Sequence, residues 1–459
     1  MEKNLTSGSV FKNILLFSLP YLLSYFLQTL YGLADLFIIG QFCGVESTTA
    51  VSVGSQVMHM LTVMIVGLAM GTTVSIGRAV GAKDTSRAGA CIGNTLTLFA
   101  GVSVVLTAAL LLLVRPMVSL ISTPAEAVEG AVSYLTVCFI GIPFITAYNI
   151  LSSVFRGMGD SKSPMYFIAI ACGVNIALDY LFIGGLGLGP VGAALGTTLS
   201  QAVSVIVSFA VIRRRGTGIP LSVRDLCPRR GAMGDILKIG LPIAVQDGLI
   251  QISFILITVI ANRRGLNDAA AVGIVEKVMS FLFLIPSSML STVSALGAQN
   301  IGAGKPRRAV QTLGYAAALA AVCGLVLSVT IQFTADGIVA LFTDPTAAGG
   351  AEVIRLGGEY LRGYIWDSAV AGIQFSFSGY FCARGKSWLS FLHNMIALLC
   401  ARVPGAYLTS RFFPDTLYPM GLASASGSVV SLIICLMAFA ILMELDRRAA
   451  ERNSLGGAK

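Results

Sequence analysis

The sequence predicts an all-α membrane protein with about twelve transmembrane helices, arranged as two pseudo-symmetric six-helix bundles. Three observations lead to this prediction. Of the 459 residues, 55% are hydrophobic and only 12% are charged, whereas about a quarter are charged in an ordinary soluble domain. The hydrophobic residues form long continuous stretches. The pattern of these stretches then repeats after about 221 residues.

The apolar stretches are long enough to cross a bilayer, which takes ~20 residues of helix. No water reaches backbone groups inside lipid, so each spanning segment must be helical. The first stretch is longer than the core of a signal peptide and no small-residue cleavage site follows it, so we expect it to be retained. The expected spans lie near residues 13–40, 48–74, 89–114, 131–156, 163–184, 190–212, 236–262, 269–297, 309–334, 356–383, 387–410 and 417–443.

Positive charge is distributed unevenly over the connections between spans. With both termini placed inside, 23 of the 31 Lys and Arg residues fall in cytoplasmic segments, five in external loops and three within spans. This asymmetry is the positive-inside rule. The net charge of +9 therefore reflects topology rather than a nucleic-acid partner. We expect a multi-pass protein of the plasma (inner) membrane, with both termini cytoplasmic, surrounded by the lipid bilayer and without an obligate protein partner.

An internal repeat sets the domain organisation. Residues 17–20 and 239–242 each end in Leu-Pro at the start of a span, and the connections at 80–83 and 301–304 also correspond. Each half has six spans, so both halves enter the membrane in the same direction, and a substrate site is expected at their interface. The expected domains are an N-terminal lobe, a basic cytoplasmic linker, and a C-terminal lobe with its tail, at 1–212, 213–235 and 236–459.

The candidate sequence motifs for enzymatic chemistry are incomplete or lie in the wrong structural context. Residues 187–192 fit GxGxxG but join two membrane spans, with no strand before them. A Walker-like run at 379–387 fails because its first glycine would have to be Tyr380. The two histidines, His59 and His393, belong to no HExxH or GxSxG arrangement, and a lone histidine in a span is read as a packed, hydrogen-bonded residue. We therefore expect no enzyme and no cofactor.

Acidic residues inside the N-terminal spans are the first candidates for function, because an acid at the centre of a span costs ~2.5–3.5 kcal/mol on insertion scales. Gln28, Tyr31 and Asp35 form one polar stripe in the first span. Pro20 in the same span can bend the helix.

The fifth span offers a second acid. Asn175 and Asp179 share a face of this span, and the hydroxyl of Thr197 lies early in the next span. Two carboxylates that converge in an apolar lobe favour a proton site. With Asn and Thr oxygens added, the set could equally hold Na⁺, since hard cations prefer oxygen ligands.

The C-terminal half carries further polar residues inside its spans. Tyr364 and Asp367 lie in the tenth span, and Glu276 in the eighth. We expect these three residues, together with Gln28 and Tyr31, to line a substrate cavity. Lys277 next to Glu276 indicates a partly neutralised local cluster. Asp247, Arg362 and Arg402 are further charged residues within the spans of this half.

These features resemble the multidrug and toxic compound extrusion (MATE) transporters over nearly the whole chain. The resemblance rests on the duplicated six-span halves, the connections at 81–83 and 302–305, the Arg-Gly-Met-Gly-Asp run at 156–160 and the Gly-Leu-Gly-Pro-Val-Gly-Ala-Ala run opening the sixth span. It implies two bundles in a V around a central cavity, and export of mostly cationic, lipophilic compounds in exchange for H⁺ or Na⁺.

The resemblance also implies roles for individual residues. The N-lobe cation site of the family resembles the set Asp35, Asn175, Asp179 and Thr197, with Pro20 as the bending residue and Gln28 and Tyr31 lining the lobe. Another branch of the family pairs an acid in the seventh span with one in the tenth. Asp367 looks like the second acid, but residues 250–251 offer no carboxylate for the first, so we expect coupling in the N lobe. The alternative function is a flippase for lipid-linked saccharides or other amphipathic molecules, since related folds carry such substrates.

Overall fold

The computed structural model describes residues 5–121, 123–216, 219, 222–346 and 349–456. All regular elements in these ranges are helical, as the sequence predicts. Ten helices there are long and apolar enough to cross a membrane, and α4 (Val128–Ile140) with α5 (Ile142–Gly157) forms an eleventh, bent span. The predicted span at 356–383 is shared between α12 (Gly350–Tyr364) and α13 (Asp367–Ala383). The predicted set of twelve spans is therefore accounted for.

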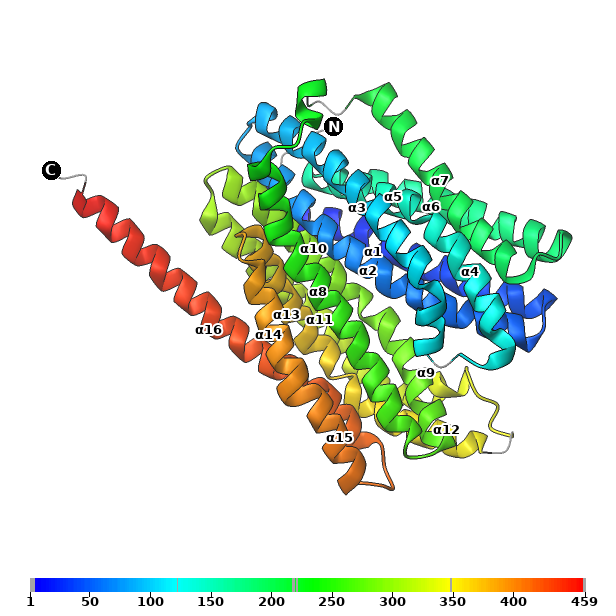
Figure 1. Ribbon diagram of the computed structural model, residues 1–459. Helices are drawn as coiled ribbons and strands as arrows, with labels where there is room; N and C mark the ends of the chain where they lie inside the picture. The colour runs from blue at the N-terminus through cyan, green and yellow to red at the C-terminus, as the bar shows by residue number, and fades with distance from the viewer. Residues whose placement is uncertain (1–4, 122, 217–218, 220–221, 347–348, 457–459) are drawn as a thin grey trace. The chain divides into compact units, whose positions relative to one another are not determined.

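The elements of the first half follow the predicted spans closely (Figure 1). The first three helices are each longer than the expected span, because polar residues at their ends extend them beyond the apolar stretch. Besides α4 and α5, the elements of this half are, in chain order, α1 (Val10–Phe42), α2 (Val45–Gly81), α3 (Thr85–Leu120), the 3-10 turn η1 (Ala125–Ala127), α6 (Lys162–Asp179), the π-helical segment η2 (Tyr180–Gly185) and α7 (Gly189–Arg215).

The second half begins after the short 3-10 turn η3 (Val223–Leu226). Parts of the predicted linker at 213–235 lie outside the described residues. Besides α12 and α13, the elements of this half are α8 (Arg230–Asn262), α9 (Leu266–Leu282), α10 (Leu284–Gly302), α11 (Pro306–Ala340), α14 (Ser387–Ala397), the π-helical segment η4 (Leu398–Arg402), α15 (Val403–Phe412) and α16 (Tyr418–Gly456).

Local chemistry explains where helices begin and where spans break. Ser9 caps α1 by accepting a hydrogen bond from the Lys12 amide, and Asp84 caps α3 by accepting one from the Arg87 amide at 2.8 Å. The fourth span bends by 49° between α4 and α5. Proline stands in the first turn of α5, where it cannot donate a hydrogen bond to the preceding turn. Such breaks put backbone irregularity inside the spans.

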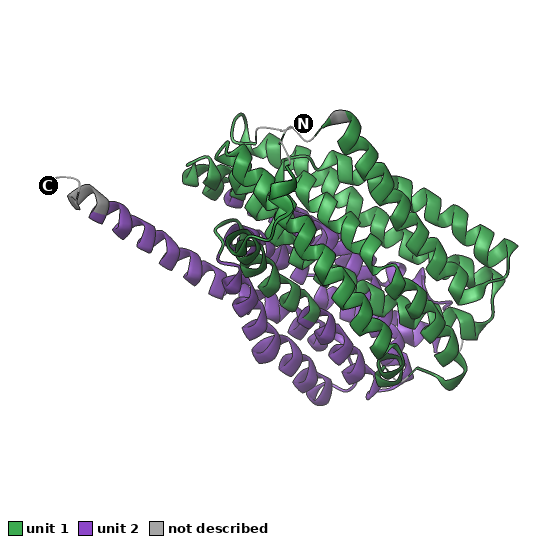
Figure 2. Ribbon diagram, turned by 45° about the horizontal axis from the view of Figure 1, so that its top comes forward, with its two compact units in different colours: residues 1–248, 291–312, 382–385 green, residues 249–290, 313–381, 386–459 purple. Residues whose placement is uncertain are grey.

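The chain forms two compact units, coloured separately in Figure 2. Unit 1 comprises residues 1–248, 291–312 and 382–385, and unit 2 comprises residues 249–290, 313–381 and 386–459. Unit 1 thus contains the N-terminal half together with the first part of α8 and the end of α10. The lobe boundaries expected from the sequence, at 212 and 236, stay a prediction.

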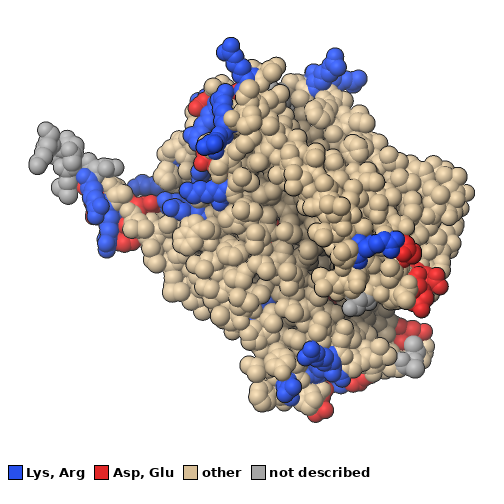
Figure 3. Space-filling model, in the orientation of Figure 1, with Lys and Arg blue, Asp and Glu red and all other residues tan. Residues whose placement is uncertain are grey.

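The surface of the long helices exposes large apolar side chains. Leu112 on α3 is 82% exposed and Phe333 on α11 is 85% exposed. On the face shown in Figure 3, charged side chains gather in separate groups, with broad uncharged areas between them. Apolar side chains exposed in such numbers would be unfavourable in water, whereas lipid tails match them. The surface therefore agrees with a multi-pass membrane protein.

Candidate functional site

A buried carboxylate of α1 meets a hydroxyl of α7 inside unit 1. Asp35 is only 2% exposed, and its Oδ2 accepts a hydrogen bond from Thr197 Oγ1 over 3.0 Å. The two residues are 162 positions apart in the chain, so only the packing of the helices brings them together. Thr197 is itself buried.

The second acid of this site lies on α6, beside α7. Asp179 and Asn175 are both fully buried and stand one helical turn apart. The Asp179 carboxylate lies against the backbone of Gly196, where a β-carbon would be 2.1 Å from Asp179 Oδ1. The side chains of Asp179 and Asn175 lie near the Asp35 carboxylate. A glycine at 196 is therefore what admits the second acid to the site.

The helix geometry changes directly after Asp179. The segment η2 begins at Tyr180, and its π-helical turn widens the end of α6 before the connection to α7. A second π-helical segment, η4, lies within the predicted eleventh span, between α14 and α15, and ends at Arg402. Such segments are frequent at functional sites.

The site has several polar atoms without a partner. Asp35 Oδ1, both carboxylate oxygens of Asp179 and both side-chain polar atoms of Asn175 are buried and make no hydrogen bond. Among the described residues, no basic side chain forms an ion pair with either acid. Buried unsatisfied groups cost about 1–3 kcal/mol each. A proton shared by the acids, or a Na⁺ ion held by these oxygens, would satisfy them.

The remaining candidates on α1 lie before Asp35. Tyr31 stands one turn earlier, with Gln28 within hydrogen-bonding reach of its hydroxyl, and both are partly exposed. Pro20 sits inside α1, which continues through it as one helix. Ser24 Oγ donates a hydrogen bond to the Pro20 carbonyl at 2.8 Å. Bending at Pro20 remains a prediction.

Unit 2 contains a separate cluster centred on Arg402. The Arg402 guanidinium donates a hydrogen bond to the Tyr364 hydroxyl and lies 4.6 Å from the centre of the Phe254 ring. Asp367 is fully buried, and its carboxylate interacts electrostatically with Arg402, as does that of Glu276. The structure therefore brings together the three candidates of the C-terminal half.

The sequence did not reveal what holds this cluster together. Lys277 adjoins Glu276 in the chain but is exposed, and the basic residue that faces Glu276 is Arg402, more than 120 positions away. Both oxygens of Asp367 and one oxygen of Glu276 make no hydrogen bond. The cluster thus combines one fixed positive charge with two acids that retain free acceptor capacity.

His393 has a structural environment. Its two ring nitrogens are hydrogen-bonded to Ser378 Oγ, at 3.0 Å, and to Ser431 Oγ. Both partners are buried serines. The interpretation of this histidine as a packed, hydrogen-bonded residue is confirmed.

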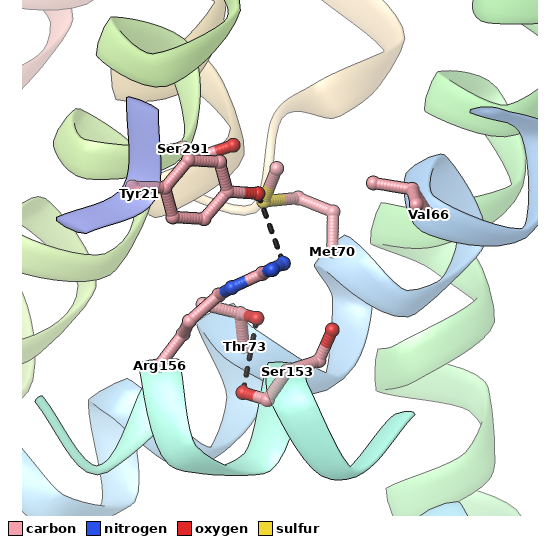
Figure 4. Close-up of a pocket in the computed structure, with 7 residues that line it drawn as sticks. All are labelled: Tyr21, Val66, Met70, Thr73, Ser153, Arg156 and Ser291. Carbon is pink, nitrogen blue, oxygen red and sulfur yellow. Dashed lines mark hydrogen bonds between the residues drawn. The ribbon is translucent and has the colours of Figure 1, made fainter. Parts of the chain in front are cut away.

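A small cavity in unit 1 was not identified from the sequence. It is lined by residues of α1, α2, α5 and α10 and contains the buried side chain of Arg156 (Figure 4). Arg156 stands at the end of an apolar span, so the charge count placed it with the cytoplasmic residues. The signal that could have found it is an arginine that precedes a glycine and completes an apolar helix, with no acid beside it in the chain.

The chain matches the MatE family model over residues 20–181 and 242–408. It is 30% identical to a probable multidrug resistance protein, YpnP, of Bacillus subtilis over 409 residues, which cover 89% of this chain and 90% of YpnP. It is also 25% identical to an FAD transporter of Shewanella oneidensis, over 88% of this chain and 89% of that protein.

A solved structure has the same fold. It shows an outward-facing conformation of a multidrug resistance MATE family transporter, with a TM-score of 0.90 and 25% identity, and the match covers 97% of this chain and 99% of the other. The family model matches each half of the chain separately, in agreement with the duplicated architecture. The protein therefore belongs to the MatE family of multi-pass membrane transporters.

Proposed function

We propose that the protein is a cation-coupled antiporter, which exports lipophilic, mostly cationic compounds by alternating access in exchange for H⁺ or Na⁺. The observation that carries this proposal is the buried pair of acids, Asp35 and Asp179, which have no basic partner among the described residues. The similarity to a probable multidrug resistance protein supports small-molecule substrates. The match to a family of transporters also favours transport over catalysis.

The coupling ion would act by cancelling charge in the N lobe. A cation that enters from outside neutralises the acids, and the Thr197 hydroxyl, which donates to Asp35 at 3.0 Å, holds one oxygen in place. α1 then bends at Pro20 and the substrate leaves to the outside. Because the site holds two acids and oxygen ligands, it is suited to one monovalent cation or to protons.

Return to the inward-open state would release the coupling ion. The acids regain negative charge, which favours binding of the next cationic substrate. Gln28 and Tyr31 of α1, and Glu276, Tyr364 and Asp367 near Arg402, would contribute polar contacts to the substrate path. In the plasma membrane, with both termini cytoplasmic, the membrane potential adds ~2.3 kcal/mol per charge per 100 mV to the inward movement of the ion.

The proposal is tested by transport in liposomes. Purified protein is reconstituted, and movement of a fluorescent lipophilic cation is followed under an imposed pH gradient or an imposed Na⁺ gradient. We expect one gradient to drive export, which identifies the ion, and we expect Asp35→Asn to abolish driven export without loss of folded protein. The neutral side chain can still accept the Thr197 hydrogen bond but cannot bind and release a charge.

A matched control distinguishes the site from any acid in a spanning helix. Asp336 on α11 is 53% exposed and pairs with Arg362 at 2.7 Å, so Asp336→Asn should leave the driven rate close to that of the wild type. Undiminished export by Asp35→Asn would refute the coupling role. Equal losses in both variants would also count against a specific site.

A second candidate function is movement of phosphate-bearing amphipathic molecules, including lipid-linked saccharides. The similarity to an FAD transporter favours this candidate, because FAD carries phosphate groups. Absence of cation export under either gradient, together with movement of a lipid-linked saccharide in the same liposomes, would support it.

A further inference from the structure

The cavity of unit 1 is lined mainly by polar side chains. The space in it that a water-sized molecule can occupy is about 10 Å³, which is about the room that one water or one ligand oxygen needs. Figure 4 shows the Arg156 guanidinium extending between Tyr21 on one side and Ser153 on the other. Val66 and Met70 of α2 provide an apolar wall. The remaining lining residues are Thr73 and Ser291.

Most of the hydrogen-bonding capacity of Arg156 is unused. The side chain is 8% exposed, and one guanidinium nitrogen donates to the Tyr21 hydroxyl at 2.9 Å. The guanidinium carbon lies 4.1 Å from the centre of the Tyr21 ring. The Nε group is buried and makes no hydrogen bond. A guanidinium has five N–H donors, so this environment leaves the group able to bind an acceptor.

In the part of the chain that the structure describes, no carboxylate forms an ion pair with this charge. Among the described residues, Arg156 forms no ion pair. The partly buried Arg402 interacts electrostatically with Glu276 and Asp367, and the partly buried Arg362 pairs with Asp336. Removing a charge from water without pairing it is unfavourable. Arg156 thus differs from Arg402 and Arg362 in having no acid assigned to it among the described residues, and a bound anion could supply its counter-charge.

A purely structural role accounts for only part of this arrangement. Arg156 stands in the last turn of α5, where a positive charge interacts favourably with the helix dipole. That interaction is small compared with the cost of burying an unpaired charge. The stacking on Tyr21 adds a cation–π contribution, but it leaves the Nε donor unsatisfied. Both effects fix the position of the guanidinium rather than neutralise it.

The hydroxyl groups around the guanidinium are donors or can become donors. The Tyr21 and Tyr25 hydroxyls lie 3.2 Å apart, and Ser291 is within hydrogen-bonding reach of Tyr25. The Thr73 hydroxyl donates to the Ser153 carbonyl at 3.1 Å. A fixed positive charge beside rotatable hydroxyls, with no acid paired to it among the described residues, is complementary to an oxyanion. An organic cation would be repelled here.

We propose that this cavity binds the phosphate or carboxylate group of an amphipathic ligand, with the anionic oxygens on Arg156 and the apolar portion against Val66 and Met70. A planar guanidinium fork matches both groups, because each offers two oxygens for paired hydrogen bonds. This inference goes beyond the export of cations proposed above and does not depend on ion coupling.

Equilibrium binding to the purified full-length protein in non-ionic detergent tests the proposal. The probes are dodecyl phosphate, dodecanoate, dodecyltrimethylammonium and inorganic phosphate. We expect Arg156→Gln to weaken binding of the two anionic amphiphiles at least tenfold and to leave the ammonium probe unchanged. The control Arg115→Gln alters an exposed arginine paired with Glu129 at 2.9 Å and should change none of them.

A second variant keeps the test decisive if Arg156→Gln does not fold. Ser153 and Arg156 are three residues apart on α5, so Ser153→Asp places a carboxylate where it can pair with the guanidinium. This internal anion should preserve folding and abolish binding of both anionic amphiphiles. Binding of only one of them would support the proposal and identify the group, and inorganic phosphate binding would show that the headgroup suffices. Unchanged anion binding by Ser153→Asp would overturn the proposal.

Discussion

Replacing Gly81 with alanine is expected to disrupt a close contact between the ends of α2 and α10 within unit 1. A β-carbon at Gly81 would stand 2.0 Å from the Gln299 carbonyl oxygen, and one at Gly302 would stand 2.1 Å from the Arg78 carbonyl oxygen. The contact is reciprocal, since each glycine faces the backbone of the other helix. We call these four residues the glycine junction.

Hydrogen bonds around the glycine junction follow the same reciprocal pattern. Arg78 donates from Nε and from one terminal nitrogen to the Ala383 carbonyl, and Gln299 Nε2 donates to the Gly157 carbonyl at 2.9 Å. Arg78 and Gln299 are separated by the 221-residue repeat, as are Gly81 and Gly302. The junction is thus a meeting point of equivalent segments from the two sequence halves. It has to separate if that end of the protein opens during transport.

The magnitude of the perturbation follows from the distance. A carbon–oxygen contact normally lies at about 3.3 Å or more, so the two backbones must separate by roughly 1.3 Å at this point. Over-packing of this kind costs about 1–3 kcal/mol. A free-energy change of that size shifts a two-state equilibrium by about 5–150-fold. The closed junction should therefore lose population in Gly81→Ala, and more so in the double variant with Gly302→Ala.

The assay is a distance measurement between spin labels. Cysteines replace Thr85 and Arg307, which are exposed residues next to the two connections of unit 1, in a background without the nine native cysteines. We expect longer label distances and slower transport in the glycine variants. Gly101→Ala is the control, because nothing lies within 4 Å of a β-carbon there. Unchanged distances and unchanged transport in the double variant would refute the reasoning.

Two further predictions concern the acid sites. Thr197→Val removes the hydroxyl that donates to Asp35, and a buried acceptor left unsatisfied costs about 1–3 kcal/mol. We therefore expect a changed ion concentration for half-maximal transport. The control Thr198→Val removes a hydroxyl that makes no hydrogen bond among the described residues and should behave like the wild type. Arg402→Gln leaves buried acids without their cationic neighbour, which typically costs about 3–5 kcal/mol. Thermal unfolding in detergent should show a clear loss of stability relative to the control Arg411→Gln. Equal stability of the two variants would contradict the role of Arg402.

The sequence alone determined the fold class and the positions of the spans. Apolar stretches of sufficient length have to be helical in lipid, because their backbone groups can bond only within the segment. The same reasoning singled out Asp35 and Asp179, since an acid in such a stretch carries a large insertion cost. Pairs that lie one turn apart on one helix, such as Asn175 and Asp179, were also readable, because helical periodicity is local.

Only the tertiary structure decided which of these residues meet. Three features join helices far apart in the chain: the contact of Asp35 with Thr197, the electrostatic interaction of Glu276 with Arg402, and the cavity around Arg156. Spacing along one helix fixes the face on which a side chain lies but not the helix that will cover it. The covering helix is chosen by packing, including close approaches at glycine, and that choice created the sites proposed here.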